Sequence, residues 1–240
     1  MKTAKLFDYQ IFNSSANDAL DIALRLIDGS RVAQIVTINP EMIELGFKDN
    51  DFALLLNEAD LLLPDGVGIK LGLMIMGEKA SRIPGIDFSY KLLQACEKSG
   101  VTVAFVGTTQ EILDKAVENV KFTMPDLKIV YTHDGFFEDN EQIYADLKQT
   151  SPGLVLVALG SPKQEFFIQG AKKVLKTGLL IGVGGSFDVW SGTVKRAPKI
   201  YQKLGLEWLY RTISQPQRFK RIFPALPLFL LKVLRSRLGV

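Results

Sequence analysis

The chain of 240 residues contains little of what builds disulfides, metal centres or membrane spans. Its one cysteine, Cys96, excludes an internal disulfide, and no other residues offer metal-ligand spacing with it. Its one histidine, His133, receives no assigned role. The longest apolar runs are far shorter than the ~20 residues that cross a bilayer. The first residues also lack the continuous apolar stretch of a signal peptide. These absences favour a protein of the reducing cytoplasm.

Acidic residues are almost missing from the last part of the chain. Residues 195–240 contain 11 lysines and arginines but a single acid, Glu207, whereas residues 1–194 contain 18 basic and 25 acidic residues. A short apolar run, residues 222–231, lies among the tail cations. Cations attract anionic lipid headgroups while an apolar helix face enters the interface. The sequence therefore predicts a main domain at 1–194 and a membrane-associating helical appendage at 195–240.

Short runs of valine, isoleucine and leucine alternate with segments of helical periodicity. Strands are predicted at residues 32–37, 61–63, 101–106, 128–131, 154–158 and 179–183. Helices are predicted at residues 17–27, 86–98, 111–121, 141–149 and 164–175, and in the tail at 200–212 and 217–237, the last kinked by Pro224 and Pro227. This alternation predicts an α/β fold with a Rossmann-like, mainly parallel sheet covered by helices.

Small and polar residues follow most of the predicted strands. In open α/β sheets, ligands bind beyond the carboxyl ends of the strands. The segments at these ends are residues 37–40, 64–66, 107–109, 160–164 and 184–188. Their glycines let backbone N–H groups approach an anion such as a phosphate. Glycine ends strands in many α/β proteins, but the five turns together favour a nucleotide or phosphosugar site.

Standard phosphate and metal motifs are absent or incomplete. No GxxxxGK[ST] segment occurs, which excludes an ordinary P-loop NTPase. Residues 65–72 (DGVGIKLG) imitate a dinucleotide fingerprint, but the third glycine comes one residue late, so an NAD-dependent oxidoreductase is the weaker alternative. Asp49 and Asp51 have the spacing of a metal-binding pair, yet no apolar strand precedes them, and Asp49 is predicted to cap a helix. We therefore expect no metal and no cofactor.

Asp65 is the candidate general base. It follows the run Leu-Leu-Leu-Pro, so its carboxylate is expected at a strand end, within a cleft of small residues. The alternative is that Asp65 caps the helix that follows. A leaving diphosphate needs its charge neutralised, and arginine forks suit that task. The candidate cations are Arg82, Lys163, Lys195, Arg196, Arg211, Arg218 and Arg221.

Six segments, in this order, resemble the WecG/TagA/CpsF family of bacterial glycosyltransferases. They are TINPEM (37–42), LPDGVG (63–68), RIPGID (82–87), ALGSPKQE (158–165), GVGGSFD (182–188) and GLEWLYR (205–211). The resemblance extends over about residues 32–221 and is strongest to the TagA branch, the N-acetylmannosaminyltransferases of wall teichoic acid synthesis.

The resemblance implies an inverting transfer of N-acetylmannosamine, without a required metal. The donor would be UDP-ManNAc, and the acceptor C4 of the GlcNAc in undecaprenyl-diphosphate-GlcNAc. Asp65 matches the family's proposed base, and the catalytic pocket would also contain Thr37, Asn39, Arg82 and Gln164. The implied substrate-binding residues are Gly184, Gly185 and Asp188 for the nucleotide, and Arg211, Arg218 and Arg221 of the appendage for a diphosphate.

Several points stay open at the level of the sequence. The donor could be a different UDP-sugar, or the chain could be a membrane-docked module that binds UDP without turnover. Phe136 and Phe137 fit either stacking on a uracil ring or packing in the core. A homo-oligomer is also left open. The expected location is the inner face of the bacterial plasma membrane, and nucleic acid is disfavoured because the basic segment is joined to an apolar run.

Overall fold

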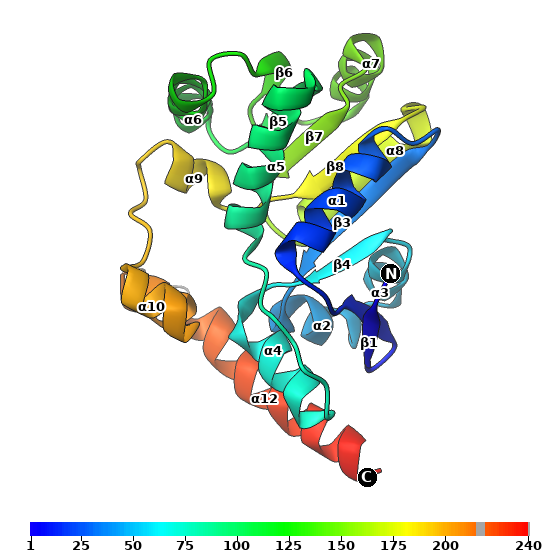
Figure 1. Cartoon of the computed structure of the whole chain (residues 1–240), viewed down its shortest axis with the longest axis vertical. Coiled ribbons are helices and arrows are strands. Elements are labelled where there is room, and N and C mark those ends of the chain that lie inside the picture. Colours follow the sequence, from blue (N-terminus) through cyan, green and yellow to red (C-terminus); the bar gives the residue numbers. More distant parts are fainter. Residues whose placement is uncertain (215–218, 240) are drawn as a thin grey trace. The chain divides into compact units, whose positions relative to one another are not determined.

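The computed structural model describes residues 1–214 and 219–239, without the side chains of residues 203, 204, 211–214 and 219–224 (Figure 1). Its strands are β1 (Thr3–Leu6), β2 (Tyr9–Phe12), β3 (Val32–Ile38), β4 (Leu61–Pro64), β5 (Thr102–Gly107), β6 (Lys128–His133), β7 (Leu154–Ala158) and β8 (Gly178–Gly182). Its helices are α1 (Ala16–Ile27), α2 (Pro40–Gly46), α3 (Asn50–Asn57), α4 (Gly66–Ile75), α5 (Gly85–Ser99), α6 (Gln110–Thr123), α7 (Glu141–Thr150), α8 (Lys163–Val174), α9 (Ser186–Trp190), α10 (Lys199–Leu204), α11 (Glu207–Ser214) and α12 (Phe219–Leu238).

The chain divides into two compact units. The first unit consists of Met1–Ser15, Thr37–Pro84 and Arg196–Val240, and the second of Ala16–Val36 and Gly85–Lys195. In the second unit the strands follow the order β3-β8-β7-β5-β6, with every neighbouring pair parallel. Every residue of β7 and β8 is buried. Continuous apolar strands of this kind belong to parallel sheets covered on both faces, as the sequence predicts.

Helices cover both faces of the strands in the second unit. Val155, Val157 and Leu180 pack with Tyr144 of α7 and Phe167 of α8. Because side chains alternate along a strand, the residues between them point to the other face. There α1 packs against both α5 and β8 (Figure 1). The helices cover the faces of the sheet, and the loops with the predicted site residues follow the carboxyl ends of its strands.

The first unit combines a short hairpin with the basic tail. Strands β1 and β2 are antiparallel, and β2 runs parallel to β4. Helix α12 lies along α4 and α2 (Figure 1). Phe229 and Val233 of α12 are fully buried, and a Cβ at Gly72 of α4 would lie 3.0 Å from the Phe229 ring. Glycine on α4 thus allows the two helices to approach closely.

The structure confirms the α/β fold and the predicted elements of its central part. All six predicted strands and the five helices between them are present within a few residues of the predicted bounds. The sequence analysis did not predict the hairpin of β1 and β2 or helices α2 and α9, and it gave α4 only as the helix that Asp65 would cap in the alternative interpretation. The predicted helix at 200–212 is interrupted, because Gly205 takes a left-handed conformation (φ 74°) between α10 and α11. Helix α12 runs through both Pro224 and Pro227 as one helix.

Within the described part of the chain, no helix combines the length and the apolar character required to cross a bilayer.

Candidate active site

Asp65 lies at the junction of β4 and α4. Its backbone is extended, and its carboxylate Oδ1 accepts a hydrogen bond of 2.7 Å from the Gly66 N–H. Gly66 has a φ of 79°, a conformation that favours glycine. The predicted capping role is thus confirmed, and the side chain remains half-buried. Each carboxylate oxygen has two lone pairs, so capping is compatible with proton acceptance.

Two backbone hydrogen bonds bring neighbouring loops to Asp65. The Asp65 N–H donates to the Ile38 carbonyl at 2.9 Å, and the Pro64 carbonyl accepts from the Ile83 N–H at 2.9 Å. The loop after β3 and the loop before α5 therefore both lie against the end of β4. This arrangement belongs to the first unit.

Three further predicted site residues lie in or next to these two loops. Thr37 is a half-buried residue near the end of β3. Asn39 caps α2, with its Oδ1 accepting from the Met42 N–H at 3.1 Å. Arg82 precedes Ile83, the residue that bonds to β4. Backbone hydrogen bonds thus place the segments that carry Thr37, Asn39 and Arg82 next to Asp65.

Arg82 is joined to the basic tail by a carboxylate. Its Nη2 donates to Oε2 of Glu207 at 2.8 Å, and Nε of Arg196 donates to Oε1 of the same residue at 3.3 Å. The side chains of Arg82 and Glu207 are each 13% exposed. The sequence singled out both arginines but did not predict that Glu207 joins them, because Arg82 and Glu207 are 125 residues apart.

Gln164 is held at the start of α8 in the second unit. Its Oε1 accepts from the Gly184 N–H at 3.1 Å, and its Nε2 donates to Oε1 of Glu165 at 2.7 Å. A Cβ at Gly182 would lie within 2.3 Å of the Gln164 amide nitrogen, so only glycine leaves room for this side chain. Two partners therefore fix which way the amide of Gln164 faces.

Glu165 is a buried acid that the sequence analysis did not single out. It is 1% exposed, and burial raises the pKa of its carboxyl above the ordinary value. The hydrogen bond from Gln164 opposes that rise. The sequence offered one indication of Glu165: it directly follows the predicted site residue Gln164, within a predicted helix.

Gly184 and Gly185 form the short connection between β8 and α9. Gly184 has a φ of 50° and is half-buried, and Gly185 is exposed at the start of the helix. Asp188 is a half-buried residue of α9 whose backbone carbonyl accepts from the Val194 N–H at 2.9 Å. Of these three predicted nucleotide-site residues, Gly184 bonds directly to Gln164.

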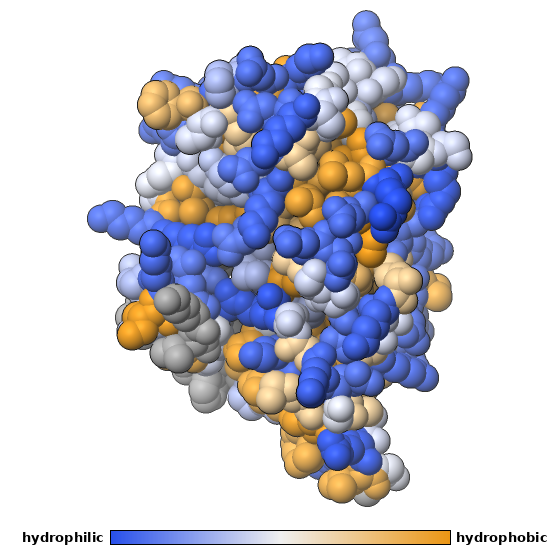
Figure 2. Space-filling model, viewed as in Figure 1, coloured by the Kyte–Doolittle hydropathy of each residue, from blue (hydrophilic) through white to orange (hydrophobic). Residues whose placement is uncertain are grey.

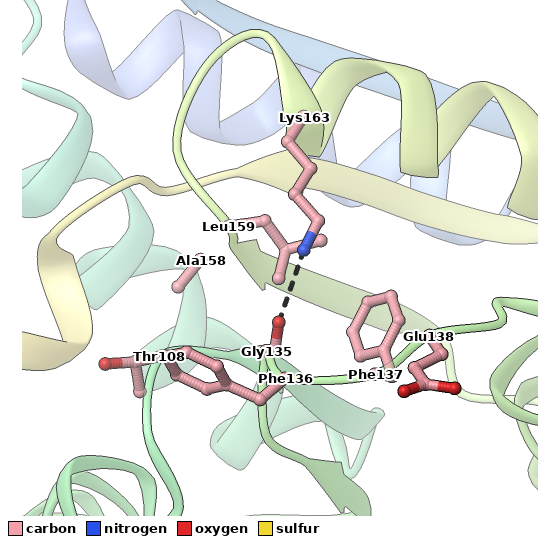
Figure 3. A pocket seen from close by; sticks show the side chains of 8 residues that line it. All are labelled: Thr108, Gly135, Phe136, Phe137, Glu138, Ala158, Leu159 and Lys163. Carbon is pink, nitrogen blue, oxygen red and sulfur yellow. Dashed lines mark hydrogen bonds between the residues drawn. The ribbon is translucent and has the colours of Figure 1, made fainter.

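A cavity of about 570 Å³ opens at the ends of β5, β6 and β7 (Figure 3). Lys163 reaches across it, with Nζ 3.3 Å from the Gly135 carbonyl and 4.9 Å from the centre of the Phe137 ring. Phe136 is 77% exposed. The cavity is lined by Thr108, Gly135, Phe136, Phe137, Glu138, Ala158, Leu159 and Lys163.

The structure does not describe the side chains of three predicted arginines, and it gives His133 only local contacts. Arg218 lies outside the described residues, as do the side chains of Arg211 in α11 and Arg221 in α12. His133 packs by its ring against Phe137, at 5.8 Å between centres, and its Nδ1 lies 2.9 Å from the Asp134 carbonyl. No group of three or more potential ligands for a metal ion occurs among the residues that the structure describes.

Comparison with known proteins agrees with these features. Residues 4–240 match the model of the Glycosyl transferase WecG/TagA/CpsF family. Two similar proteins are named N-acetylglucosaminyldiphosphoundecaprenol N-acetyl-beta-D-mannosaminyltransferase. The one from Bacillus spizizenii is 34% identical over 210 residues, which cover 87% of this chain and 81% of that protein. The one from Bacillus subtilis is 33% identical over 238 residues, which cover 98% and 93%. The chain therefore belongs to the WecG/TagA/CpsF family of glycosyltransferases.

Proposed function

We propose that this glycosyltransferase moves N-acetylmannosamine from UDP-ManNAc to C4 of the GlcNAc in undecaprenyl-diphosphate-GlcNAc. The product would carry an inverted, β-1,4 linkage and serve as the linkage unit of wall teichoic acid. The observation that carries the proposal is that two relatives named N-acetylglucosaminyldiphosphoundecaprenol N-acetyl-beta-D-mannosaminyltransferase match most of the chain at 33% and 34% identity. Membership of a glycosyltransferase family rules out the alternative of an NAD-dependent oxidoreductase.

Asp65 would act as the general base. Its carboxylate would take the proton from the acceptor hydroxyl while that oxygen attacks the anomeric carbon and UDP leaves from the opposite face. The position of Asp65 supports this role, because it lies at the end of β4, where backbone hydrogen bonds bring the segments after β3 and before α5 against it. A positioned base contributes about 10² to 10⁴ in rate. Thr37, directly before the last residue of β3, and Asn39, directly after that strand, would contact the sugars.

The nucleotide would bind at the strand ends of the second unit. The exposed ring of Phe136 offers a flat face for uracil at the cavity, and Lys163 adds a cation there. Strand β8 neighbours β7, so the loop of Gly184 and Gly185 follows the adjacent strand and can present backbone N–H groups to the phosphates. Asp188 and Gln164 belong to the same site by this proposal.

The catalytic pocket would be completed by cations. Arg82 lies in the loop beside Asp65, and its fork suits the diphosphate of a substrate. The tail residues Arg211, Arg218 and Arg221 would meet a diphosphate as well. With this set the chemistry needs no metal, because guanidinium groups neutralise the charge of the leaving group.

Helix α12 would dock on the inner face of the plasma membrane. Leu228, Leu231, Leu234 and Leu238 are 46–68% exposed, at a helical spacing that gives one apolar stripe. Phe229 and Val233 face the protein instead. Figure 2 shows apolar surface interleaved with hydrophilic surface at the lower tip, where α12 ends in Figure 1. Such a surface fits a peripheral enzyme that receives a lipid-linked substrate.

We retain the division into a catalytic part, 1–194, and an appendage, 195–240, as a functional proposal. In the structure the appendage packs with residues 1–15 and 37–84 in one unit, so it would complete the catalytic part as well as anchor it.

A donor screen tests the proposed activity. The full chain is incubated with a lipid-diphosphate-GlcNAc acceptor and, separately, with UDP-ManNAc, UDP-GlcNAc, UDP-glucose or UDP-glucuronic acid. We expect efficient transfer from UDP-ManNAc, measured as a lipid product that has gained one N-acetylhexosamine. Efficient transfer from another donor alone would replace the proposed donor. Absence of transfer from every donor would contradict the proposed activity.

A further inference from the structure

Glu207 occupies an unusual electrostatic position. It is the single acid among residues 195–240, and it lies between the guanidinium groups of Arg82 and Arg196 at 2.8 and 3.3 Å. All three side chains are mostly removed from water, with exposed fractions of 13% for Glu207 and Arg82 and 25% for Arg196. Ion pairs that are partly buried are screened less than exposed ones. The cluster therefore retains a stronger interaction than a surface salt bridge.

The carboxylate allows two cations to stand close together. Two guanidinium groups repel each other in a region of low water content, and a carboxylate between them offsets that repulsion. These three side chains comprise two cations and one anion. An arginine has five N–H donors. The bond from Nη2 to Glu207 therefore leaves the Arg82 fork with donors for a second anion.

The backbone places this fork beside the proposed base. Ile83 bonds to Pro64, so Arg82 and Asp65 each lie one residue from that hydrogen bond. The tail approaches the same place at Gly205, where a Cβ would lie 3.2 Å from the Val67 side chain and 3.8 Å from Nη1 of Arg82. The absence of a side chain at Gly205 thus allows the tail to approach closely enough for Glu207 to contact Arg82.

We propose that Glu207 is a positioning residue, which holds the guanidinium of Arg82 so that it binds a diphosphate of a substrate beside Asp65. The inference rests on the proposed function, since that reaction uses two diphosphate-bearing substrates. The sugar nucleotide and the lipid-linked acceptor present the same chemistry to the arginine. Glu207 acts through Arg82 and has no direct contact with the reacting atoms in this proposal.

The tail also provides a matched control. Lys232 of α12 bonds to Glu44 of α2 at 2.7 Å, and the Glu44 side chain is 10% exposed. This pair, like that of Glu207 and Arg82, ties the tail to the body of the first unit through a largely buried acid. It involves no proposed site arginine. If Glu207 only seats the tail, then Glu207→Gln and Glu44→Gln should have the same consequences.

The experiment compares the full chain with Glu207→Gln, Glu44→Gln, Arg82→Ala and the double variant Glu207→Gln/Arg82→Ala. The readouts are kcat, the KM of each substrate, and the melting temperature. We expect Glu207→Gln to lower kcat/KM about tenfold or more, as for loss of a charge-assisted hydrogen bond. Glu44→Gln should stay within about twofold at a comparable loss of melting temperature. In the Arg82→Ala background, Glu207→Gln should cause no further loss.

Two results would overturn the inference. One is equal loss of turnover in Glu44→Gln and Glu207→Gln. The other is a full effect of Glu207→Gln when Arg82 is already alanine. The substrate whose KM rises identifies which diphosphate Arg82 binds. If the unaltered chain transfers no sugar, the proposed function fails, and the affinity for UDP and for inorganic pyrophosphate becomes the readout. Glu207→Gln should then weaken binding of one of these probes while Glu44→Gln does not, and equal affinities would contradict the inference.

Discussion

Asp65 caps α4 and is also the proposed general base, and one substitution distinguishes these two roles. Asparagine is also a good N-cap, so Asp65→Asn should preserve α4 and the melting temperature. It cannot accept the proton, so turnover should fall by about 10² to 10⁴ while donor affinity is unchanged. Asp49→Asn is the matched control, because Asp49 caps α3 through the Phe52 N–H at 3.0 Å. Near-normal turnover in Asp65→Asn would remove Asp65 from the role of base.

Glu165 makes stability depend on pH in a defined direction. Burial raises the pKa of its carboxyl in the folded protein above the ordinary value of 4.5. Its contribution to stability is therefore complete below that value and is lost as the pH rises through the folded pKa. Glutamine does not titrate. The melting temperature of Glu165→Gln, relative to the unaltered chain, should rise from pH 4 to pH 8, and a constant or falling difference would contradict this account.

The roles of some residues could be predicted from their neighbours in the sequence, whereas roles that depend on distant contacts could not. The capping roles of Asp49 and Asp65 follow from the residues next to them, and the structure confirms both. The pairing of Glu207 with Arg82 depends on how a segment 125 residues away packs. A single sequence contains no local signal for such a contact. The roles of the site residues themselves remain predictions.

At the scale of elements, glycine content explains why helix α4 was predicted only as an alternative. The strands of the second unit are continuous runs of strongly apolar residues, which makes them easy to predict. Helix α4 contains Gly66, Gly68 and Gly72, which have low helix propensity. A Cβ at Gly68 would lie 2.3 Å from the Pro40 ring and 2.7 Å from the Leu226 side chain. The glycines therefore serve packing between α2, α4 and α12, which local propensity does not describe.

The exposed stripe of α12 predicts a loss of membrane binding without a loss of stability. We expect Leu231→Ser combined with Leu234→Ser to weaken binding to vesicles that contain anionic lipid by about tenfold or more, since each buried leucine contributes about 1.5–3 kcal/mol. The melting temperature should change little, because both side chains are nearly half exposed. Vesicle co-sedimentation measures the effect.

A surface control makes this test specific. Phe122 on α6 is 89% exposed, and Phe122→Ser removes a comparable apolar group from another helix. It should leave vesicle binding unchanged. Equal weakening by both changes, or no weakening by the α12 change, would refute docking through this stripe.

At the scale of the whole molecule, the charge pattern and the packing of the tail have different origins. The sequence shows that the cations are concentrated after residue 194, which marks a boundary in composition. The structure groups residues 196–240 with two segments from the first third of the chain. Leu226 and the buried Phe229 account for this, because they pack against Gly68 and Gly72 of α4. Composition predicted that the tail is distinct, but could not predict its partner.

The decisive measurement is the release of UDP from UDP-ManNAc by the full chain, with and without lipid-diphosphate-GlcNAc, together with the linkage in the product as determined by NMR. We expect UDP to appear at a substantial rate only when the acceptor is present, and the new bond to join the acceptor O4 in the β configuration. UDP release at the same rate without acceptor, or an α-linked product, would contradict the proposed function.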